Sequence, residues 1–272
     1  MLIIFYYILM ENNNNINNVT FVTAYLKTYE SDYDETKSFE KRLELFMKIV
    51  ELNINICLFI SPEYKDAIDL ISNKHKNLIV IEVLSIEDLE ITKIGNRNSH
   101  LLLSLPDRRN CTKDSPNYMF LMNSKIEFIK KTIDVNPFNN DYFCWFDFSL
   151  PYIFKNMESC FTKLKWYSES KFISEPFIAM PGCWKKCGNV DFLKDSICWR
   201  FCGGFFIGDK NSLLSFYHVS MTHFEEFLNL TKKLVWEVNY WAWLELMGYK
   251  SFMWYLADHN DTIINIPTHV II

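Results

Sequence analysis

The first half of the chain alternates between short, continuously apolar runs and longer amphipathic segments. The apolar runs are rich in β-branched and aromatic residues, which favour strands, and they predict strands over Val19–Tyr25, Asn53–Ile60 and Asn77–Val83. Between them, apolar residues recur at three- and four-residue spacing, which predicts helices over Glu35–Leu52 and Pro62–His75. Because the strands are continuously apolar and alternate with helices, they indicate a parallel sheet covered on both faces.

The second half has a less regular pattern. It predicts helices over Tyr118–Ile133, Ser212–Leu230 and Trp236–Met247, and strands over Tyr142–Ser149, Phe172–Met180, Ser196–Gly208, Tyr249–Leu256 and Ile263–Ile266. No linker or internal repeat separates the halves, so we expect one domain over residues 19–272. The predicted fold class is α/β, with a mostly parallel central sheet flanked by helices and a mixed α/β C-terminal half.

Residues 1–18 differ from the rest of the chain. The apolar run over residues 1–10 is much shorter than the roughly 20 residues that span a bilayer, and it lacks the basic flank and cleavage site of a signal peptide. An Asn-rich tract follows it. We expect a disordered leader or an over-long gene start, with Met10 as the alternative initiator. The expected location is cytoplasmic, with a weak anchor that makes the protein peripheral to a membrane as the alternative.

Composition narrows the class of protein and of ligand. With 272 residues, of which 49% are hydrophobic, the chain can bury a substantial core. A formal net charge of −5 argues against nucleic-acid binding, which requires a basic face. It does not exclude a phosphorylated small molecule whose charge is offset by a cation or by local Lys and Arg side chains.

Asp147 is the first candidate functional residue. It lies near the end of the apolar stretch Tyr142–Pro151, where an unpaired buried charge would be very costly. Ligands of open α/β sheets bind outside the carboxyl ends of the strands, so Asp147 is a candidate ligand of a divalent metal or of a polar substrate. The alternative is a cap for a helix that begins near Pro151.

The stretch Trp199–Gly208 carries two adjacent glycines in a chain with only seven. Gly203 and Gly204 would weaken an aromatic strand, so a bulge or the close approach of a ligand to the backbone is needed to explain them. In that case Arg200 could contact a phosphate through two hydrogen bonds. The alternative is a β-bulge that serves packing, with Arg200 in a structural ion pair.

Two further polar groups stand among aromatic residues near the C-terminus. Glu237 and Asn239 at the start of a helix suit sugar recognition and acid–base chemistry, although Glu237 could simply stabilise the helix N-terminus. Asp258 and His259 lie in a polar run that could be a turn, and His259 together with Asp147 could also bind Mn²⁺ or Mg²⁺.

Taken together, these stretches resemble the HtrL/YibB-like family of glycosyltransferases, also described as the WlaTC-like group. The matching segments run in order from Thr20 to Ile264: TFVTAYL, KDSPNYMFLMNSKIEFI, FCWFDFSLPYIF, WRFCGGFFIGD, WEVNYWAWLE and LADHNDTI. The resemblance implies a GT-A-type enzyme, in which an α/β domain binds a nucleotide-sugar donor with the help of Mn²⁺ or Mg²⁺.

The resemblance also implies roles for individual residues. Asp147 stands at the first acid of a D-x-D motif whose second acid is replaced here by Ser149. Asp147 and His259 are the implied metal ligands, and Asp147 and Glu237 are the implied catalytic residues, with Glu237 the general base of an inverting reaction. The implied donor- or acceptor-binding residues are Thr23, Ala24, Tyr25, Lys125, Trp145, Arg200, Gly203, Gly204, Asn239 and Asp258.

The predicted function is therefore transfer of a sugar from a nucleotide-diphosphate donor to a glycan or another hydroxyl acceptor. One alternative is a binding module for nucleotide sugars that has lost turnover, which the D-F-S sequence favours. Another is a metal-dependent phosphohydrolase that uses Asp147, Asp258 and Asp261. A homodimer is left open.

Overall fold

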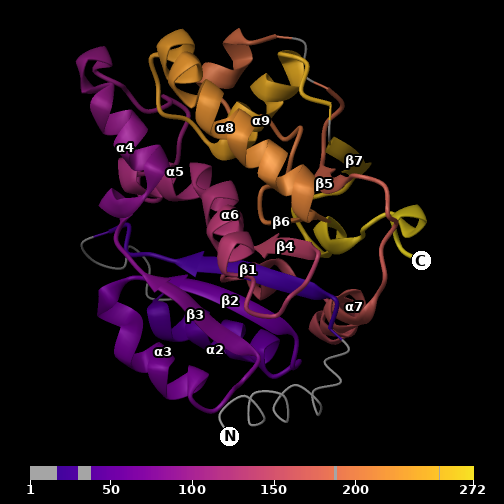
Figure 1. Ribbon diagram of the computed structural model, residues 1–272. Helices are drawn as coiled ribbons and strands as arrows, with labels where there is room; N and C mark the ends of the chain where they lie inside the picture. Colours follow the sequence, from indigo (N-terminus) through magenta and orange to yellow (C-terminus); the bar gives the residue numbers. More distant parts are fainter. Residues whose placement is uncertain (1–16, 30–37, 187–188, 251) are drawn as a thin grey trace, which may run out of the picture.

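The computed structural model describes residues 17–29, 38–186, 189–250 and 252–272 (Figure 1). The predicted leader over residues 1–18 lies mostly outside the described residues. Asn17 and Asn18 lie inside them: the Asn17 amide donates to the carbonyl of Asn53 at 2.9 Å, and the Asn18 N–H donates to the carbonyl of Ser168 at 2.6 Å. The packed part of the chain thus begins two residues earlier than the predicted domain boundary at residue 19.

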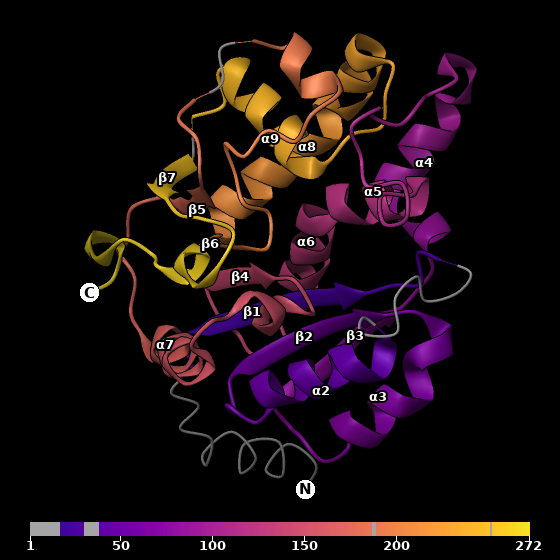
Figure 2. The ribbon, with the colours of Figure 1, turned by 180° about the vertical axis from the view of Figure 1, so that it is seen from behind.

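Within the described residues, seven strands form one sheet in the order β3-β2-β1-β4-β6-β5-β7. The strands are β1 (Val19–Tyr25), β2 (Asn55–Ile60), β3 (Leu78–Val83), β4 (Tyr142–Phe146), β5 (Ile178–Gly182), β6 (Phe205–Asp209) and β7 (Phe252–Leu256). Strand β6 runs antiparallel to both of its neighbours, and all other neighbouring pairs are parallel. The predicted mostly parallel sheet is confirmed, and Figure 2 shows β1 between β2 and β4.

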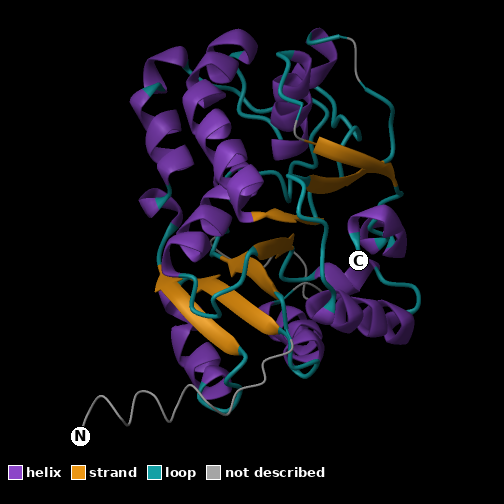
Figure 3. Cartoon of the chain, turned by 45° about the vertical axis from the view of Figure 1, so that its right-hand side comes forward, coloured by secondary structure: helices purple, strands orange, loops and turns teal. Residues whose placement is uncertain are grey.

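Helices cover both faces of the sheet (Figure 3). They are α2 (Phe39–Val50), α3 (Lys65–Ser72), α4 (Glu90–Arg97), α5 (Pro116–Asn123), α6 (Lys125–Val135), α7 (Met157–Glu169), α8 (Lys210–Thr231) and α9 (Glu237–Leu246). Among the described residues, no helix has both the length and the apolar character needed to cross a membrane. The predicted α/β fold class, with helices flanking the sheet, is confirmed.

Alternate residues of each strand pack into two separate hydrophobic cores. On β4, Phe143 and Trp145 belong to the core between the sheet and helices α4, α6, α8 and α9. Cys144 and Phe146 point to the other face and belong to the core between the sheet and helices α2, α3 and α7. Because both faces are buried, the strands are continuously apolar, as the sequence indicated.

The predicted helix over Tyr118–Ile133 is wrong in one respect, because the chain forms two helices there. Helix α5 ends at Asn123, and Ser124 has φ −88° and ψ 0°, outside the regular helix. The Ser124 hydroxyl donates to the carbonyl of Phe120 at 2.9 Å, and Lys125 becomes the first residue of α6. Apolar residues continue through the break, which is why the periodicity does not reveal it.

Parts of three predicted strands are also wrong. Only residues 205–208 of the predicted strand Ser196–Gly208 pair in the sheet, and turns lie at residues 199–200 and 203–204. Only residues 178–180 of the predicted strand Phe172–Met180 belong to β5. The predicted strand Ile263–Ile266 overlaps a short 3₁₀ helix, η7 (Asp261–Ile264). Helix α7 was not predicted.

The reversed strand β6 brings distant segments to one edge of the sheet. Phe205 at its start lies opposite Phe146 at the end of β4. The chain continues this pairing beyond the strands, since the Asp147 N–H donates to the carbonyl of Gly204 at 2.9 Å. The glycine pair therefore lies beside Asp147, at the edge where the parallel strands β1 and β4 end.

Candidate active site

A cavity of about 1080 Å³ opens at this edge of the sheet. It is lined by Ala24 and Tyr25 at the end of β1, by Trp145 and Asp147 at the end of β4, and by Gly204 and His259. The carboxyl edge of an α/β sheet is where ligands of such folds bind, and the volume suits a nucleotide-sized ligand. Sequence regions more than 200 residues apart thus meet in one cavity.

Lys125 is the centre of a buried ion cluster behind the cavity. Its Nζ lies 2.9 Å from Oδ1 of Asp147 and 2.8 Å from Oε1 of Glu237, and it donates to the carbonyl of Gly203 at 2.9 Å. The Lys125 side chain is 1% exposed and that of Glu237 is 7% exposed, whereas Asp147 is 38% exposed. The cluster therefore presents Asp147 to the cavity and keeps Glu237 behind it.

The ionic states of this cluster follow from its surroundings. Burial acts to lower the pKa of Lys125, but the carboxylates of Asp147 and Glu237 raise it above its ordinary value, so the ammonium stays charged. The nearby Tyr118 lines the cavity, and burial together with the charges of Glu237 and Asp147 raises the pKa of its phenol. Tyr118 is therefore a neutral hydrogen-bonding group at physiological pH.

The two glycines serve different purposes. A Cβ on Gly203 would lie 2.1 Å from Oε1 of Glu237 and 3.2 Å from Nζ of Lys125, so a side chain there would displace the ion pair. Gly204 lines the cavity, and a Cβ there would lie 3.4 Å from Oδ2 of Asp147. The lack of a side chain at Gly203 is thus explained by the ion cluster, and Gly204 is the one that leaves room beside the cavity.

Asp147 does not act as a helix cap through its side chain. The next helical turn is η5 (Leu150–Ile153), preceded by Ser149, and it has no side-chain capping bond. Oδ1 of Asp147 instead accepts a hydrogen bond from the indole N–H of Trp145 at 2.9 Å, in addition to the contact with Lys125. Two donors therefore fix the orientation of this carboxylate.

His259 lies in the cavity wall with its ring edge-on to Trp199, at a centroid distance of 5.2 Å. Partial burial lowers the pKa of His259 below its ordinary value of 6.5; the charges of Lys113 and Lys125 act in the same direction, and the Asp147 carboxylate opposes them. The imidazole is therefore neutral at pH 7, which is the form that binds metals.

The predicted metal ligands Asp147 and His259 line the same cavity. In the described parts of the chain, no three His, Cys, Asp or Glu side chains gather in a group that could hold a metal ion. Two protein ligands suit an ion that arrives with a diphosphate, because Mg²⁺ is often held by one or two carboxylates together with phosphates and waters. The donor set thus fits an ion shared with the substrate and does not fit a resident ion.

Aromatic side chains form another part of the cavity wall. Tyr25 and Tyr64 line the cavity, with ring centroids 5.1 Å apart, and the Tyr25 ring lies 4.8 Å from that of Phe148. Such a surface suits a planar base. Thr23 does not line the cavity; it is buried, and its hydroxyl has no hydrogen-bond partner among the described residues.

Several predicted site residues lie elsewhere. Arg200 makes two hydrogen bonds to the carboxylate of Glu245, at 2.9 and 2.7 Å, and its guanidinium lies 4.6 Å from the ring centroid of Trp254. This geometry corresponds to the structural ion pair that was the alternative for Arg200. Neither Arg200 nor the exposed Asp258 lines the cavity.

The side chain of Asn239 is committed to backbone groups. Its Oδ1 accepts from the N–H of Cys198 at 2.7 Å, and its Nδ2 donates to the carbonyls of Leu193 and Ser196, each at 2.8 Å. The residue is completely buried and lies outside the cavity lining. Asn239 therefore holds the loop before the glycine pair.

The three carboxylates of the phosphohydrolase alternative do not form one site. Both oxygens of Asp261 accept backbone N–H groups, from Lys155 at 2.9 Å and Asn156 at 3.1 Å. Of the three, only Asp147 belongs to the described cavity lining. The geometry gives no support to a metal-dependent phosphohydrolase at this place.

The structure adds two basic residues that the sequence analysis missed. Arg42 on α2 donates from Nη1 to the Ser149 hydroxyl at 3.0 Å, and both residues line the cavity. Lys113 also lines the cavity, with its Nζ 4.8 Å from the ring centroid of Tyr118. Arg42 lies outside the segments that carry the family resemblance, and Lys113 opens one of them but was given no role; their contacts with distant segments reveal them.

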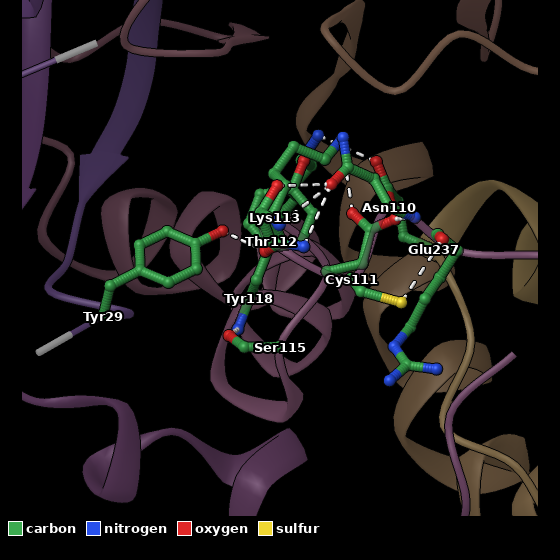
Figure 4. A network of polar contacts seen from close by, with 11 residues as sticks. Tyr29, Asn110, Cys111, Thr112, Lys113, Ser115, Tyr118 and Glu237 are labelled. Atoms are coloured by element: carbon green, nitrogen blue, oxygen red, sulfur yellow. Dashed lines mark hydrogen bonds and ion pairs between the residues drawn. The ribbon is translucent and has the colours of Figure 1, made fainter. Parts of the chain in front are cut away.

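A compact turn fixes the backbone of Lys113 (Figure 4). Oδ1 of Asn110 accepts the N–H groups of Thr112 and Lys113 at 3.1 and 3.2 Å, as in an Asx turn. The hydroxyl of Tyr29, just beyond β1, donates to the carbonyl of Lys113. The turn is thereby tied to the end of the first strand.

Comparisons with known proteins identify one family and two similar solved structures. A family model described as "Bacterial protein of unknown function (HtrL_YibB)" matches residues 17–234, a range that includes Lys125, Asp147 and Gly204. No curated protein sequence matches the chain.

Two solved structures are similar to the chain over most of its length. They are the apo form of mouse xyloside xylosyltransferase 1 (7% identity, 88% of this chain and 85% of that chain, TM-score 0.44) and 4-diphosphocytidyl-2C-methyl-D-erythritol synthase from Anaerococcus prevotii DSM 20548 (9% identity, 94% and 96%, TM-score 0.43). At these scores and identities neither likeness bears on the function of this chain.

We expect Lys125→Met to lower the free energy of unfolding by about 3–5 kcal/mol, because it leaves the buried Glu237 carboxylate without its partner. Lys125→Met combined with Glu237→Leu should recover more than half of that loss. Urea denaturation measures both. Lys130→Met on the same helix removes an exposed pair with Asp134 and should cost less than about 1 kcal/mol. Equal losses for Lys125 and Lys130 would contradict the cluster.

We expect Asn239→Ala to destabilise the fold by about 2–4 kcal/mol, because it leaves three buried backbone groups without their partner. Asn229→Ala on the exposed face of α8 is the matched control and should change stability by less than about 0.5 kcal/mol. A stable Asn239→Ala protein that fails to bind its ligand would instead indicate a substrate-binding role.

We expect His259 to make the fold less stable in acid. Because its pKa in the folded state lies below 6.5, the unfolded chain takes up the proton first, so the penalty is absent well above pH 6.5 and grows as the pH falls below it. His259→Gln should therefore lose less stability than the wild type between pH 7 and pH 5 in urea denaturation. The exposed control His100→Gln should retain the wild-type loss; identical pH profiles for both variants would refute the assignment.

Proposed function

We propose that this chain, which belongs to the HtrL_YibB family, transfers a sugar from a nucleoside diphosphate donor to a hydroxyl group of an acceptor. The observation that carries the proposal is the meeting of Asp147, Gly204 and His259 with the end of β1 in one cavity. These are the positions to which the resemblance with GT-A-type enzymes assigned the donor. Nothing in the residue pattern alone required them to meet.

The parts of the cavity match the parts of such a donor. The aromatic wall of Tyr25 and Tyr64 offers a surface for the base, next to Ala24 at the end of β1. Asp147 and Gly204 lie where the sugar and the diphosphate would meet the sheet edge. The volume of about 1080 Å³ leaves room for part of an acceptor beside the donor.

In the proposed reaction, the bond between the anomeric carbon and the donor phosphate breaks, and the acceptor oxygen forms the new bond to that carbon. The nucleoside diphosphate leaves with the bonding electrons, so negative charge grows on its phosphate oxygens. Positive groups that are already in place lower the cost of that charge. Lys125 supplies one behind Asp147. The hydroxyl proton of the acceptor passes to a phosphate oxygen of the leaving nucleoside diphosphate, directly or through water.

We assign Glu237 the positioning of Lys125. Its Oε1 is engaged by the ammonium group at 2.8 Å, and Glu237 does not belong to the described cavity lining. Its predicted role as a general base stays a prediction. Asp147 would contact the donor directly, because it is the member of the cluster that reaches the cavity.

A divalent ion bound together with the diphosphate would be held by Asp147 and His259 and would neutralise charge on the leaving phosphates. In this chain, the imidazole of His259 and Oδ2 of Asp147 would be the ligand atoms, because Oδ1 of Asp147 is engaged by Lys125 and Trp145.

A non-catalytic binding module for nucleotide sugars is the second candidate. The observation that favours it is the position of Glu237 behind Gly203, since no carboxylate other than those of Asp147 and Glu44 belongs to the described cavity lining. Donor binding without transfer to any acceptor and without hydrolysis of the donor would establish this alternative.

The proposal is tested by thermal unfolding with a panel of UDP- and GDP-sugars, each with and without Mn²⁺. A donor at about 100 times its Kd stabilises the fold by about 2.7 kcal/mol, which raises Tm by about 5–10 °C in a chain of this size. Asp147→Asn should remove this shift, and Asp141→Asn, an exposed change at the opposite end of β4, should retain it. No shift with any donor under either condition would refute the proposal.

A further inference from the structure

The sulfur atoms of Cys183 and Cys202 lie in contact, 3.6 Å apart. Both residues are free thiols, and neither belongs to the described cavity lining. Cys202 is completely buried, whereas Cys183 is partly exposed. The pair thus combines a thiol that a dissolved reagent can reach with a second thiol that is shielded from solvent.

Backbone hydrogen bonds hold the two cysteines beside each other. The Cys183 N–H donates to the carbonyl of Trp199 at 2.8 Å, and the Cys202 N–H donates to the carbonyl of Pro181 at 2.7 Å. Pro181 belongs to β5, so the segment that carries Cys202 is attached directly to a strand of the sheet. The contact between the two sulfurs is therefore set by the backbone on both sides.

The sulfurs need only a short movement to form a bond. A disulfide has an S–S distance of about 2.05 Å, so the present distance of 3.6 Å would shorten by about 1.5 Å. Among the described residues, no group of three or more His, Cys, Asp or Glu side chains could hold a metal ion. Two sulfurs alone fall short of the four ligands of a structural zinc site and suit a disulfide.

We propose that Cys183 and Cys202 are a redox modification site, which a small disulfide such as oxidised glutathione converts to a reversible disulfide. The Cys183 thiolate attacks one sulfur of oxidised glutathione, and the other glutathione leaves with the proton that Cys183 has lost. Cys202 then attacks the Cys183 sulfur of this mixed disulfide, and the second glutathione leaves with the proton of Cys202. Two electrons thereby pass from the cysteine sulfurs to oxidised glutathione, and an excess of a dithiol reverses the reaction.

The environments of the two thiols determine the order of these steps. The thiolate is the attacking form, and burial, together with the neighbouring Cys183, raises the pKa of Cys202 above its ordinary value. The partly exposed Cys183 therefore reacts first, and the attack by Cys202 is the slower step. The bond would attach the turn that carries Gly203, whose carbonyl accepts from Lys125, to the end of β5.

The test treats the folded full chain with oxidised glutathione, blocks the remaining thiols with iodoacetamide and maps all cysteines by peptide mass spectrometry. A peptide that links Cys183 to Cys202 should be the main cross-linked product, and dithiothreitol should remove it. The exposed Cys111 is an internal control that should acquire glutathione in every variant. Because a cross-link restricts the unfolded chain, the linked protein should melt about 5–10 °C higher than the reduced protein.

Two variants and an unfolded sample make the test specific. Cys202→Ser removes the second thiol and should retain glutathione on Cys183. Cys183→Ser should leave Cys202 unmodified, because the buried thiol is not reached by the reagent. In urea, where short loops close more readily than long ones, the link between Cys198 and Cys202 should exceed that between Cys183 and Cys202.

The site is independent of the nucleotide-sugar function proposed above, and its test requires no ligand. Links spread over other cysteine pairs in the folded protein would overturn the inference. A Cys202→Ser protein whose Cys183 stays free while Cys111 carries glutathione would also overturn it. An unchanged or lower Tm of the linked protein would show that the bond distorts the fold and would contradict the geometric argument.

Discussion

The buried ammonium group of Lys125 is the interaction on which the site depends. It contacts Asp147, Glu237 and the carbonyl of Gly203, which accounts for the three hydrogen bonds that an ammonium can donate. Removing this charge from water costs free energy. The two carboxylates offset that cost only because each has an oxygen within 2.9 Å of Nζ of Lys125. Four segments of the chain are thereby joined at one atom.

The ion cluster around Lys125 explains several local irregularities of the chain. The break at Ser124 makes Lys125 the first residue of α6, at the sheet edge. Gly203 lacks a side chain because Glu237 occupies the space beside it. Asn239, on the same helix as Glu237, holds the loop that leads to the glycine pair. The same helix N-terminus therefore carries one residue for the ion cluster and another for the loop.

The cluster also determines what the cavity offers to a ligand. Oδ1 of Asp147 is held by Lys125 and Trp145, while Oδ2 lies on the side of Gly204. The carboxylate is thus oriented before any ligand arrives, as a precise binding site requires.

Much of the fold followed from the sequence because buried strands and amphipathic helices leave strong periodic signals. β1, β2 and β3 lie where the continuous apolar runs predicted them. Asp147 was recognised for a physical reason, since a carboxylate at the end of an apolar strand needs a partner. The family resemblance assigned Gly204 and His259 to the binding site of the donor, and both line the cavity.

The remaining features could not be derived because they depend on contacts between distant segments. Arg200 and Asn239 have side chains suited to substrates, and the same groups suit Glu245 and backbone carbonyls equally well. Arg42 lies in an ordinary amphipathic helix, and only the approach of Ser149 distinguishes it from its neighbours. The break at Ser124 is hidden because apolar residues continue on both sides of it.

The cavity can form only when the antiparallel strand β6 has joined the sheet. The lining residues Tyr25, Asp147, Gly204 and His259 come from nearly the whole length of the described chain, and the last of them follows β7. Contacts between such distant segments form slowly, because long loops must close before the contacts can stabilise them. The first four strands can pair in order as they emerge, but Asp147 meets Gly204 only after β6 inserts beside β4 in the opposite direction. The contact between Asp147 and Gly204, and with it the complete lining of the cavity, therefore depends on the pairing of β6 with β4.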